Sequence, residues 1–112
     1  MNSDILYLIY ILTAISDIES STKNLSKEEF IKIKDIKDAT IRRIEIIGEA
    51  VKNISEDLKN KHSEVEWKKI IGTRDRLIHA YFDVDLDITW DIIKINLPDL
   101  KNKISKIKKE LE

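Results

Sequence analysis

One short segment of the chain carries three side chains that can act together on a phosphate. It reads Arg74-Asp75-Arg76-Leu77-Ile78-His79-Ala80-Tyr81. The segment combines a permanent cation, an imidazole that titrates near neutral pH and a phenol. This set suits metal-free cleavage of RNA. In that reaction a base takes the proton of the 2′-hydroxyl, an acid protonates the leaving oxygen and a cation stabilises the charge that develops on the phosphate.

The spacing of these three groups does not suit one regular helix. At about 100° per residue, Arg74 and Tyr81 lie about 20° apart and two turns distant, whereas His79 points almost opposite to Tyr81. The helix can unwind near His79, which would turn His79 and Tyr81 toward one cleft. Alternatively, a second chain can complete the cleft. A two-fold dimer with the segment at its axis would supply two copies of Arg74 and of His79, and so both an acid and a base.

The same residues also have ordinary structural explanations. A histidine flanked by apolar Ile78 and Ala80 is often a packing residue, and Asp75 and His79, four residues apart, can form a surface pair on a helix. His62, the only other histidine, stands in a polar run and is expected in solvent. No metal site is expected, because two histidines seventeen residues apart and scattered carboxylates do not form a recognisable ligand set.

The composition favours a small helical protein. The chain has 112 residues, with two Gly, one Pro and no Cys, so turn-rich sheets, disulfides and thiolate sites are not expected. Residues 1–112 are predicted to form one domain, and the lack of Cys makes the cytoplasm the default location. Lys and Arg number 20 against 21 Asp and Glu, for a formal net charge of −1. RNA binding would therefore need local positive charge.

Hydrophobic spacing predicts an all-α fold of four main helices and one short helix. The first helix is expected over about 4–20 after a Ser3 cap, and its apolar run is too short to span a bilayer. We interpret it as a core helix. The polar run at 20–24 is predicted to be a loop, and a capping box at 26–29 begins the short helix.

A long helix is predicted over about 35–58, because apolar residues recur there in steps of three and four. Its seam consists of Ile36, Thr40, Ile44, Ile47, Val51, Ile54 and Leu58. Gly48 lies in this helix, and its missing side chain would let another helix approach closely. A loop is expected at 59–64.

The reactive segment is expected on a helix that runs from Trp67 to about Phe82. An acidic connection at 83–87 follows, with Asp87 as the cap of the last helix. Pro98 should kink that helix without ending it, since apolar residues continue beyond it at near-heptad spacing.

In its reactive segment the sequence resembles the HepT family, the minimal HEPN-domain toxins of type VII HepT/MntA toxin–antitoxin modules, whose signature is Arg-x4-6-His-x-Tyr. The resemblance extends to Ile47-Gly48-Glu49-Ala50, to Trp67-Lys68-Lys69-Ile70-Ile71-Gly72, and to Trp90 with Leu97-Pro98-Asp99-Leu100. It covers nearly the whole chain. It implies a HEPN-type helical bundle that forms a two-fold homodimer with the segment at the interface.

The resemblance also implies an activity and a partner. The activity is that of an RNA endonuclease toxin without metal or other cofactor, with Arg74 and His79 as the catalytic pair and no membrane contact. The partner is an MNT-type nucleotidyltransferase antitoxin that transfers AMP from ATP onto Tyr81. The added phosphate and base would neutralise and occlude the cleft. Two alternatives stay open: a HEPN-like binding subunit of a nucleotidyltransferase complex without nuclease activity, and a bundle whose segment only packs.

Overall fold

The computed structural model describes residues 3–79 and 86–112, without the side chains of 76–79. Within these ranges it contains helices and no strand, which confirms the all-α prediction. The helices are α1 (Ser3–Thr22), α2 (Lys27–Lys32), α3 (Lys34–Asn53), α4 (Glu56–Lys61), α5 (Trp67–His79), α6 (Leu86–Asp91) and α7 (Leu97–Leu111). A π-helical segment, η2 (Ile92–Asn96), joins α6 to α7.

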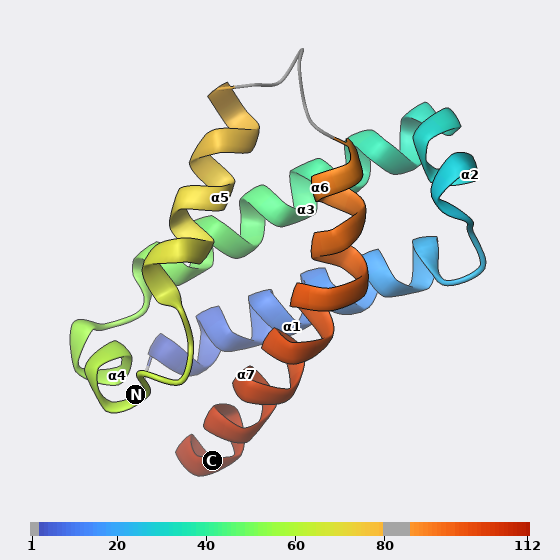
Figure 1. The fold of residues 1–112 in the computed structure, drawn as a ribbon. Coiled ribbons are helices and arrows are strands. Elements are labelled where there is room, and N and C mark those ends of the chain that lie inside the picture. The colour runs from blue at the N-terminus through green and yellow to red at the C-terminus, as the bar shows by residue number, and fades with distance from the viewer. Residues whose placement is uncertain (1–2, 80–85) are drawn as a thin grey trace.

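The long helices pack in two crossing groups. In Figure 1, α1 and α3 lie side by side, and α5 and the rod formed by α6, η2 and α7 cross them on one side. Helix α3 contacts both α1 and α5, and α1 contacts α7. The fully buried core side chains on these helices include Leu8, Ile11, Ile15, Ile18, Val51 and Ile104. Helix α5, which carries the reactive segment as far as His79, therefore rests directly on α3.

Helix α1 is a core helix, as predicted, but it is longer than expected. By length and composition alone it could cross a membrane; in this fold it packs against α3 and α7, with a fully buried stripe at helical spacing. The loop predicted at 20–24 begins too early, because α1 continues through Thr22. The Ser21 and Thr22 hydroxyls donate to the Ile18 carbonyl at 3.1 and 2.7 Å, which satisfies them without leaving the helix.

The single long helix predicted over 35–58 is wrong, because the structure breaks it into α3 and α4. The apolar seam nevertheless continues across the break, with Ile54 and Leu58 both buried. At the break, the backbone amide and the hydroxyl of Ser55 donate to the carboxylate of Asp4 in α1 at 2.8 and 2.6 Å. The Ser55 hydroxyl also accepts from the Leu58 amide and caps α4.

The expectation that His62 is in solvent is also wrong. Helix α4 fills the first part of the loop predicted at 59–64, and His62 at its end is only 7% exposed. Its Nδ1 atom lies 2.8 Å from Glu64, and its Nε2 atom lies 3.3 Å from Glu110 near the end of α7. The Trp67 indole donates to the His62 carbonyl at 3.0 Å. Two nearby residues and Glu110, from the far end of the chain, therefore surround a residue that its polar sequence neighbours indicated as surface.

The short helix begins as predicted. The Ser26 amide donates to Glu29 at 2.9 Å, and the Glu29 amide donates to the Ser26 hydroxyl at 3.1 Å, which completes the capping box. Asp87 does not cap the following helix, because α6 already begins at Leu86. Its carboxylate instead pairs with Lys27 of α2 at 2.5 Å.

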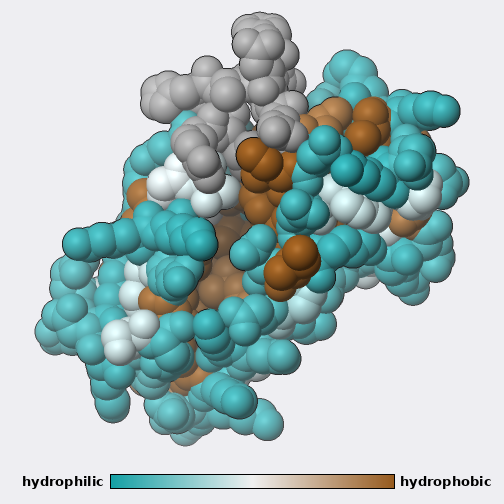
Figure 2. All heavy atoms as spheres, viewed as in Figure 1, coloured by the Kyte–Doolittle hydropathy of each residue, from teal (hydrophilic) through white to brown (hydrophobic). Residues whose placement is uncertain are grey.

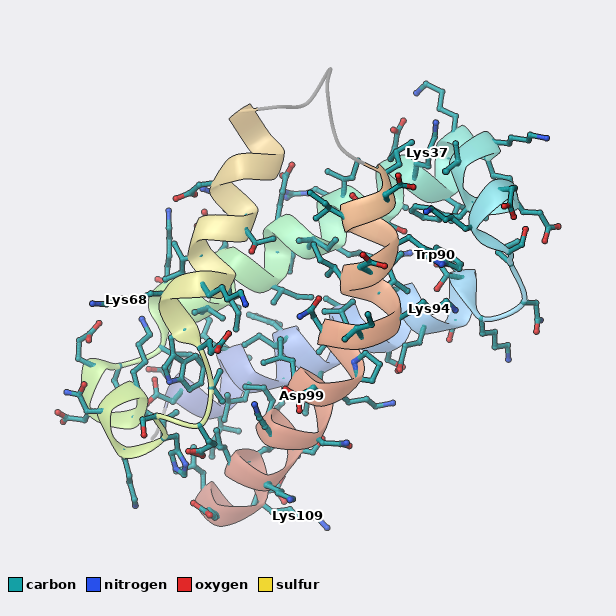
Figure 3. All side chains as sticks on the ribbon, viewed as in Figure 1. Lys37, Lys68, Trp90, Lys94, Asp99 and Lys109 are labelled. Atoms are coloured by element: carbon teal, nitrogen blue, oxygen red, sulfur yellow. The ribbon has the colours of Figure 1, made fainter. Side chains whose placement is uncertain are left out.

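The predicted last helix is a rod of three segments. The prediction that Pro98 does not end this helix is confirmed, since α7 continues to Leu111. Shortly before Pro98, the five residues of η2 adopt a π-helical pattern, in which the Leu97 amide donates to the Ile92 carbonyl. Proline has no amide hydrogen to donate, so a change in the hydrogen-bond pattern beside it costs little. Figure 3 shows Lys94 beside Trp90, with its Nζ atom 4.7 Å from the ring centroid.

Candidate functional site

Arg74 lies where α5 crosses Gly48 of α3. A Cβ atom built on Gly48 would come within 2.5 Å of both the Cβ and the Cγ atoms of Arg74. No residue with a side chain fits there unless the two helices shift. The prediction that Gly48 admits another helix is confirmed, and that helix is α5. Because Gly48 has no side chain, the Cβ and Cγ atoms of Arg74 can pack directly against α3.

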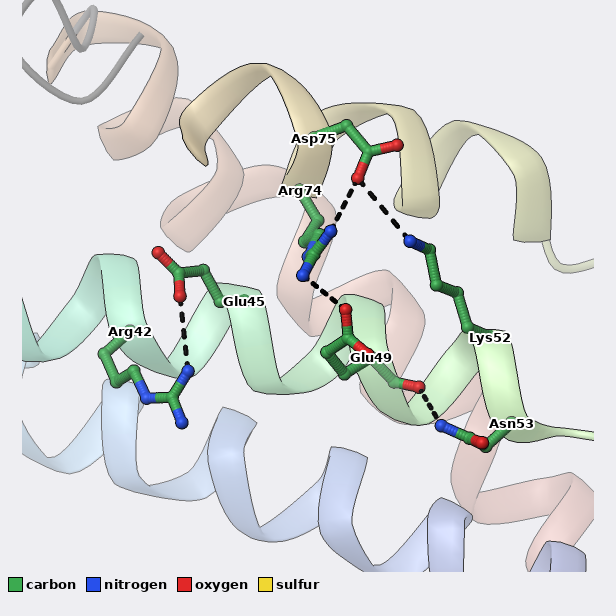
Figure 4. A network of polar contacts seen from close by, with 7 residues as sticks. All are labelled: Arg42, Glu45, Glu49, Lys52, Asn53, Arg74 and Asp75. Carbon is green, nitrogen blue, oxygen red and sulfur yellow. Dashed lines mark hydrogen bonds and ion pairs between the residues drawn. The ribbon is translucent and has the colours of Figure 1, made fainter. Parts of the chain in front are cut away.

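Two carboxylates hold the guanidinium of Arg74, as Figure 4 shows. Its Nη2 atom pairs with Glu49 of α3, and its Nη1 atom donates to Asp75 at 2.8 Å. Asp75 also lies 3.8 Å from the Nζ atom of Lys52. The Arg74 side chain is 20% exposed, and its Nε atom is buried without a hydrogen-bond partner in the part of the chain that the structure describes. The protein thus orients this guanidinium before any ligand arrives.

The surrounding carboxylates also keep Arg74 charged. The hydrogen bond to Asp75 raises the pKa of Arg74 above its ordinary value and outweighs the lowering by burial, and the charges of Glu49, Asp75 and Glu45 act in the same direction as that bond. With the ion pair between Arg42 and Glu45 at 3.3 Å, the network holds three cations and three carboxylates. Because its charges balance, this network does not by itself supply the local positive charge that RNA binding was expected to need.

The other residues of the predicted segment are only partly described. Helix α5 stays regular to His79, so no unwinding precedes that residue, and by helical register it lies about 140° around the axis from Arg74. The side chains of Arg76, Leu77, Ile78 and His79 and all of Ala80 and Tyr81 lie outside the described residues. The surface pair of Asp75 with His79 therefore stays untested, while Asp75 is bonded to Arg74 and faces Lys52.

Glu49 and Lys52 belong to the charge network, although neither was among the site residues predicted from the sequence. The signal that could have found them was Gly48. A helix that crosses at a glycine must meet the side chains that flank it, and Glu49 and Lys52 are the next residue and the one a turn later.

Two hollows lie on either side of α3. The larger, of about 380 Å³, is a furrow between α5 and the rod of α6, η2 and α7. Figure 2 shows hydrophobic surface along its floor. Its lining includes Ile44, Ile47, Ile70, Ile92, Leu97 and Leu100, with Lys69, Lys103, Asp91 and Asp99 among the polar residues. The smaller, of about 180 Å³, lies between α1 and α3 and shares Glu49 with the charge network.

Comparison with known proteins supplies the family. The family model described as "Ribonuclease HepT-like" matches residues 11–107. The chain belongs to the HepT-like ribonuclease family. This membership confirms the resemblance predicted from the sequence. The matched residues include both Gly48 and Arg74, where α3 and α5 cross.

Relatives of this HepT-like chain are named as ribonucleases. It is 45% identical, over 92% of its length and 94% of the relative's, to a "Probable ribonuclease HepT" of Thermococcus cleftensis. It is 44% identical to a "Putative RNase" of Methanocaldococcus jannaschii, over 95% of its length and 91% of the relative's. All of the chain matches a longer protein of that organism, a "Gamma-glutamylcyclotransferase and putative RNase", at 44% identity, but it spans only 51% of that protein. No solved structure matches the chain significantly.

Proposed function

We propose that this HepT-like protein is a toxin that cleaves RNA without a metal ion, with Arg74 and His79 as its catalytic pair. The observation that carries the proposal is the guanidinium of Arg74, seated on Gly48 and held by Glu49 and Asp75. A cation oriented in advance stabilises developing charge without the cost of ordering it during the reaction. Membership in a ribonuclease family supports phosphodiester cleavage as the reaction.

The proposed reaction uses the 2′-hydroxyl of the RNA. One His79 takes the proton of this hydroxyl, its oxygen attacks the adjacent phosphorus, and the bond from phosphorus to the 5′-oxygen breaks. A second, protonated His79 donates its proton to that leaving oxygen. Arg74 stabilises the negative charge on the phosphorus oxygens in the transition state.

We assign the complete site to a homodimer with two-fold symmetry. One chain has one His79, and the only other histidine, His62, is buried between two carboxylates next to the start of α5. Helical register separates His79 from Arg74 by about 140°. A symmetric pair of chains supplies two histidines and lets the arginine of one chain serve with the histidine of the other.

We also propose that the protein's partner is an MNT-type nucleotidyltransferase antitoxin. This partner would transfer AMP from ATP to Tyr81. In the transfer, the Tyr81 hydroxyl loses its proton, its oxygen attacks the α-phosphorus of ATP, and pyrophosphate leaves. The attached AMP brings a negative phosphate and a bulky base beside the catalytic cations, so it repels and blocks RNA. The spacing of Tyr81 two residues after His79 supports this assignment.

Cleavage of RNA in the presence of EDTA tests the catalytic proposal. The Arg74→Ala and His79→Ala variants should stay helical by circular dichroism and lose cleavage by several orders of magnitude. Arg43→Ala is the control, because it removes an arginine of the same bundle that lies outside the network of Figure 4. This variant should still cleave RNA. Cleavage that persists in both site variants would contradict the proposal.

Incubation with the antitoxin and ATP tests the regulation. Mass spectrometry should find AMP on Tyr81, and the modified protein should no longer cleave RNA. The competing function is a HEPN-like binding subunit of a nucleotidyltransferase complex. The balanced charge of the Arg74 network supports this alternative, because it provides no excess positive charge for RNA. A tight complex and AMP on Tyr81, without any nuclease activity in the unmodified dimer, would favour that alternative.

A further inference from the structure

The smaller hollow lies between the N-terminal half of α1 and the part of α3 from Arg42 to Asn53. Tyr7 and Tyr10 line it from α1, and one face of α3 lines the other side with Arg42, Ile46, Glu49, Ala50 and Asn53. Its volume is about 180 Å³. We infer that this hollow binds one unpaired nucleobase of a single-stranded RNA, an inference that rests on the proposed ribonuclease function.

The two tyrosines suit a flat aromatic ligand. Their rings meet edge to face, with centroids 6.1 Å apart and an angle of 71° between the planes. In this arrangement the two rings do not stack on each other, so a ring face stays open to a third group. Tyr10 is 47% exposed and can reach such a ligand. Stacking of a base on one aromatic side chain commonly changes affinity about tenfold or more, whichever base it is.

The α3 side of the hollow can contact the edge of a base. The Asn53 amide group donates to the Glu49 carbonyl at 2.8 Å, which fixes the side chain, and its oxygen has no hydrogen-bond partner among the described residues. Arg42, 68% exposed, supplies donors on the same face. Ile46 and Ala50 provide apolar surface between them. An apolar lining with a few fixed polar groups is typical of sites for small planar ligands.

Glu49 connects the hollow to the candidate catalytic arginine. Its carboxylate pairs with Arg74, and the same residue is part of the lining of the hollow. A phosphate at Arg74 and a base at Tyr10 would therefore both lie next to one residue of α3, as neighbouring parts of one strand do. A base paired in a duplex cannot enter the hollow unless it leaves its stack. The substrate class is consequently RNA with unpaired bases next to the cleaved phosphate.

The surface beside the hollow raises the competing possibility of a protein contact. Leu6 and Ile9 of α1 are 46% and 39% exposed, and such aliphatic side chains suit a second copy of this chain. Neither residue lines the hollow, whose lining combines two phenols with an arginine, an amide and a carboxylate around the apolar surface of Ile46 and Ala50. Charged residues are depleted from the cores of protein interfaces, so this lining favours a base over an aliphatic partner.

Fluorescence anisotropy with a labelled single-stranded RNA tests the inference. The RNA carries 2′-O-methyl groups, which block cleavage through the 2′-hydroxyl, and the salt concentration is held constant. Tyr10→Leu keeps apolar bulk but removes the ring, so it should weaken binding about tenfold. Tyr10→Trp should bind at least as tightly as the unchanged protein. Ile9→Ser is the matched control on the same helix and should bind like the unchanged protein, and a fully paired duplex should bind at least about tenfold more weakly.

Several results would overturn the inference. The inference is wrong if the unchanged protein shows no measurable RNA binding. It is also wrong if Tyr10→Leu keeps the full RNA affinity, or if Tyr10→Leu and Tyr10→Trp lose RNA affinity equally. Loss of RNA binding in Ile9→Ser together with loss of self-association in sedimentation would identify the face as a contact between copies. Because the labelled RNA cannot be cleaved, a protein that passes this test but does not cleave ordinary RNA would contradict only the proposed nuclease. One that cleaves but fails this test would contradict only the base site.

Discussion

Replacement of Gly48 by alanine should destabilise the protein, because the added methyl group has no room beside α5. The new Cβ atom would lie 2.5 Å from the Cβ and Cγ atoms of Arg74 and 3.3 Å from its Cδ atom. The Cβ atom of Arg74 moves only with its backbone, so relief requires α5 to shift on α3. Overpacking of this kind costs about 1–3 kcal/mol, whereas alanine in a helix regains about 0.5–1 kcal/mol relative to glycine.

Gly72 on α5 provides the matched control. A Cβ atom added there would meet nothing within 4 Å, so Gly72→Ala should receive only the gain in helix propensity and become more stable by about 0.5–1 kcal/mol. Both substitutions exchange glycine for alanine within a helix. Their difference in free energy of unfolding therefore isolates the steric cost at Gly48, about 2 kcal/mol. Urea denaturation of both variants at equal protein concentration measures it.

The same substitution also tests the site. A shift of α5 would move Arg74 away from Glu49, so Gly48→Ala should reduce RNA cleavage more than Gly72→Ala does. If the free energy of unfolding of Gly48→Ala equals or exceeds that of Gly72→Ala, the close approach of the two helices is refuted.

Three further predictions concern buried and paired polar groups. Thr40 is fully buried, and its hydroxyl has no partner among the described residues, so Thr40→Val should raise the free energy of unfolding by about 1 kcal/mol in thermal denaturation. Asp4→Ala removes the acceptor of two hydrogen bonds from Ser55 and should lower that free energy by about 1–3 kcal/mol in urea. The pKa of Glu64 is held below its ordinary value of 4.5 by a hydrogen bond from its own backbone and then by His62. The stability that Glu64 contributes is thus present above pH 4.5 and is lost as the pH falls through the lowered pKa. The free energy of unfolding of Glu64→Gln, measured against pH, should therefore fall less steeply on the acid side. A profile identical to that of the unchanged protein would contradict this prediction.

Short-range patterns predicted most of the helices and most of the buried seam. Steps of three and four residues indicated that Thr40, Ile44, Ile47 and Val51 share the inner face of α3, and all four are buried. The capping box at 26–29 predicted the start of α2. These features depend only on residues within one or two helical turns, so the sequence carries them locally.

Features that depend on distant residues were not predictable in this way. The apolar seam runs unbroken through Ile54, and only the bonds from Ser55 to Asp4, in another helix, reveal why the chain turns there. His62 is buried where α4 ends, and one of its partners, Glu110, comes from the last helix of the chain. In the candidate site, the sequence predicted that Gly48 admits another helix and that Arg74 lies on a helix of its own. It did not predict that these two helices cross, and the pairing of Arg74 with Glu49 follows from that crossing.

The link between Asp4 and Ser55 also constrains the order in which the fold assembles. It joins residues 51 positions apart. The length-dependent part of closing a flexible loop of that size, three halves of RT ln n, costs about 3.5 kcal/mol, whereas two hydrogen bonds return about 1–3 kcal/mol together. The bonds therefore cannot close the loop by themselves. Apolar packing of α1 on α3 has to come first, and protection of the Ser55 amide from hydrogen exchange then reports that α1 has docked.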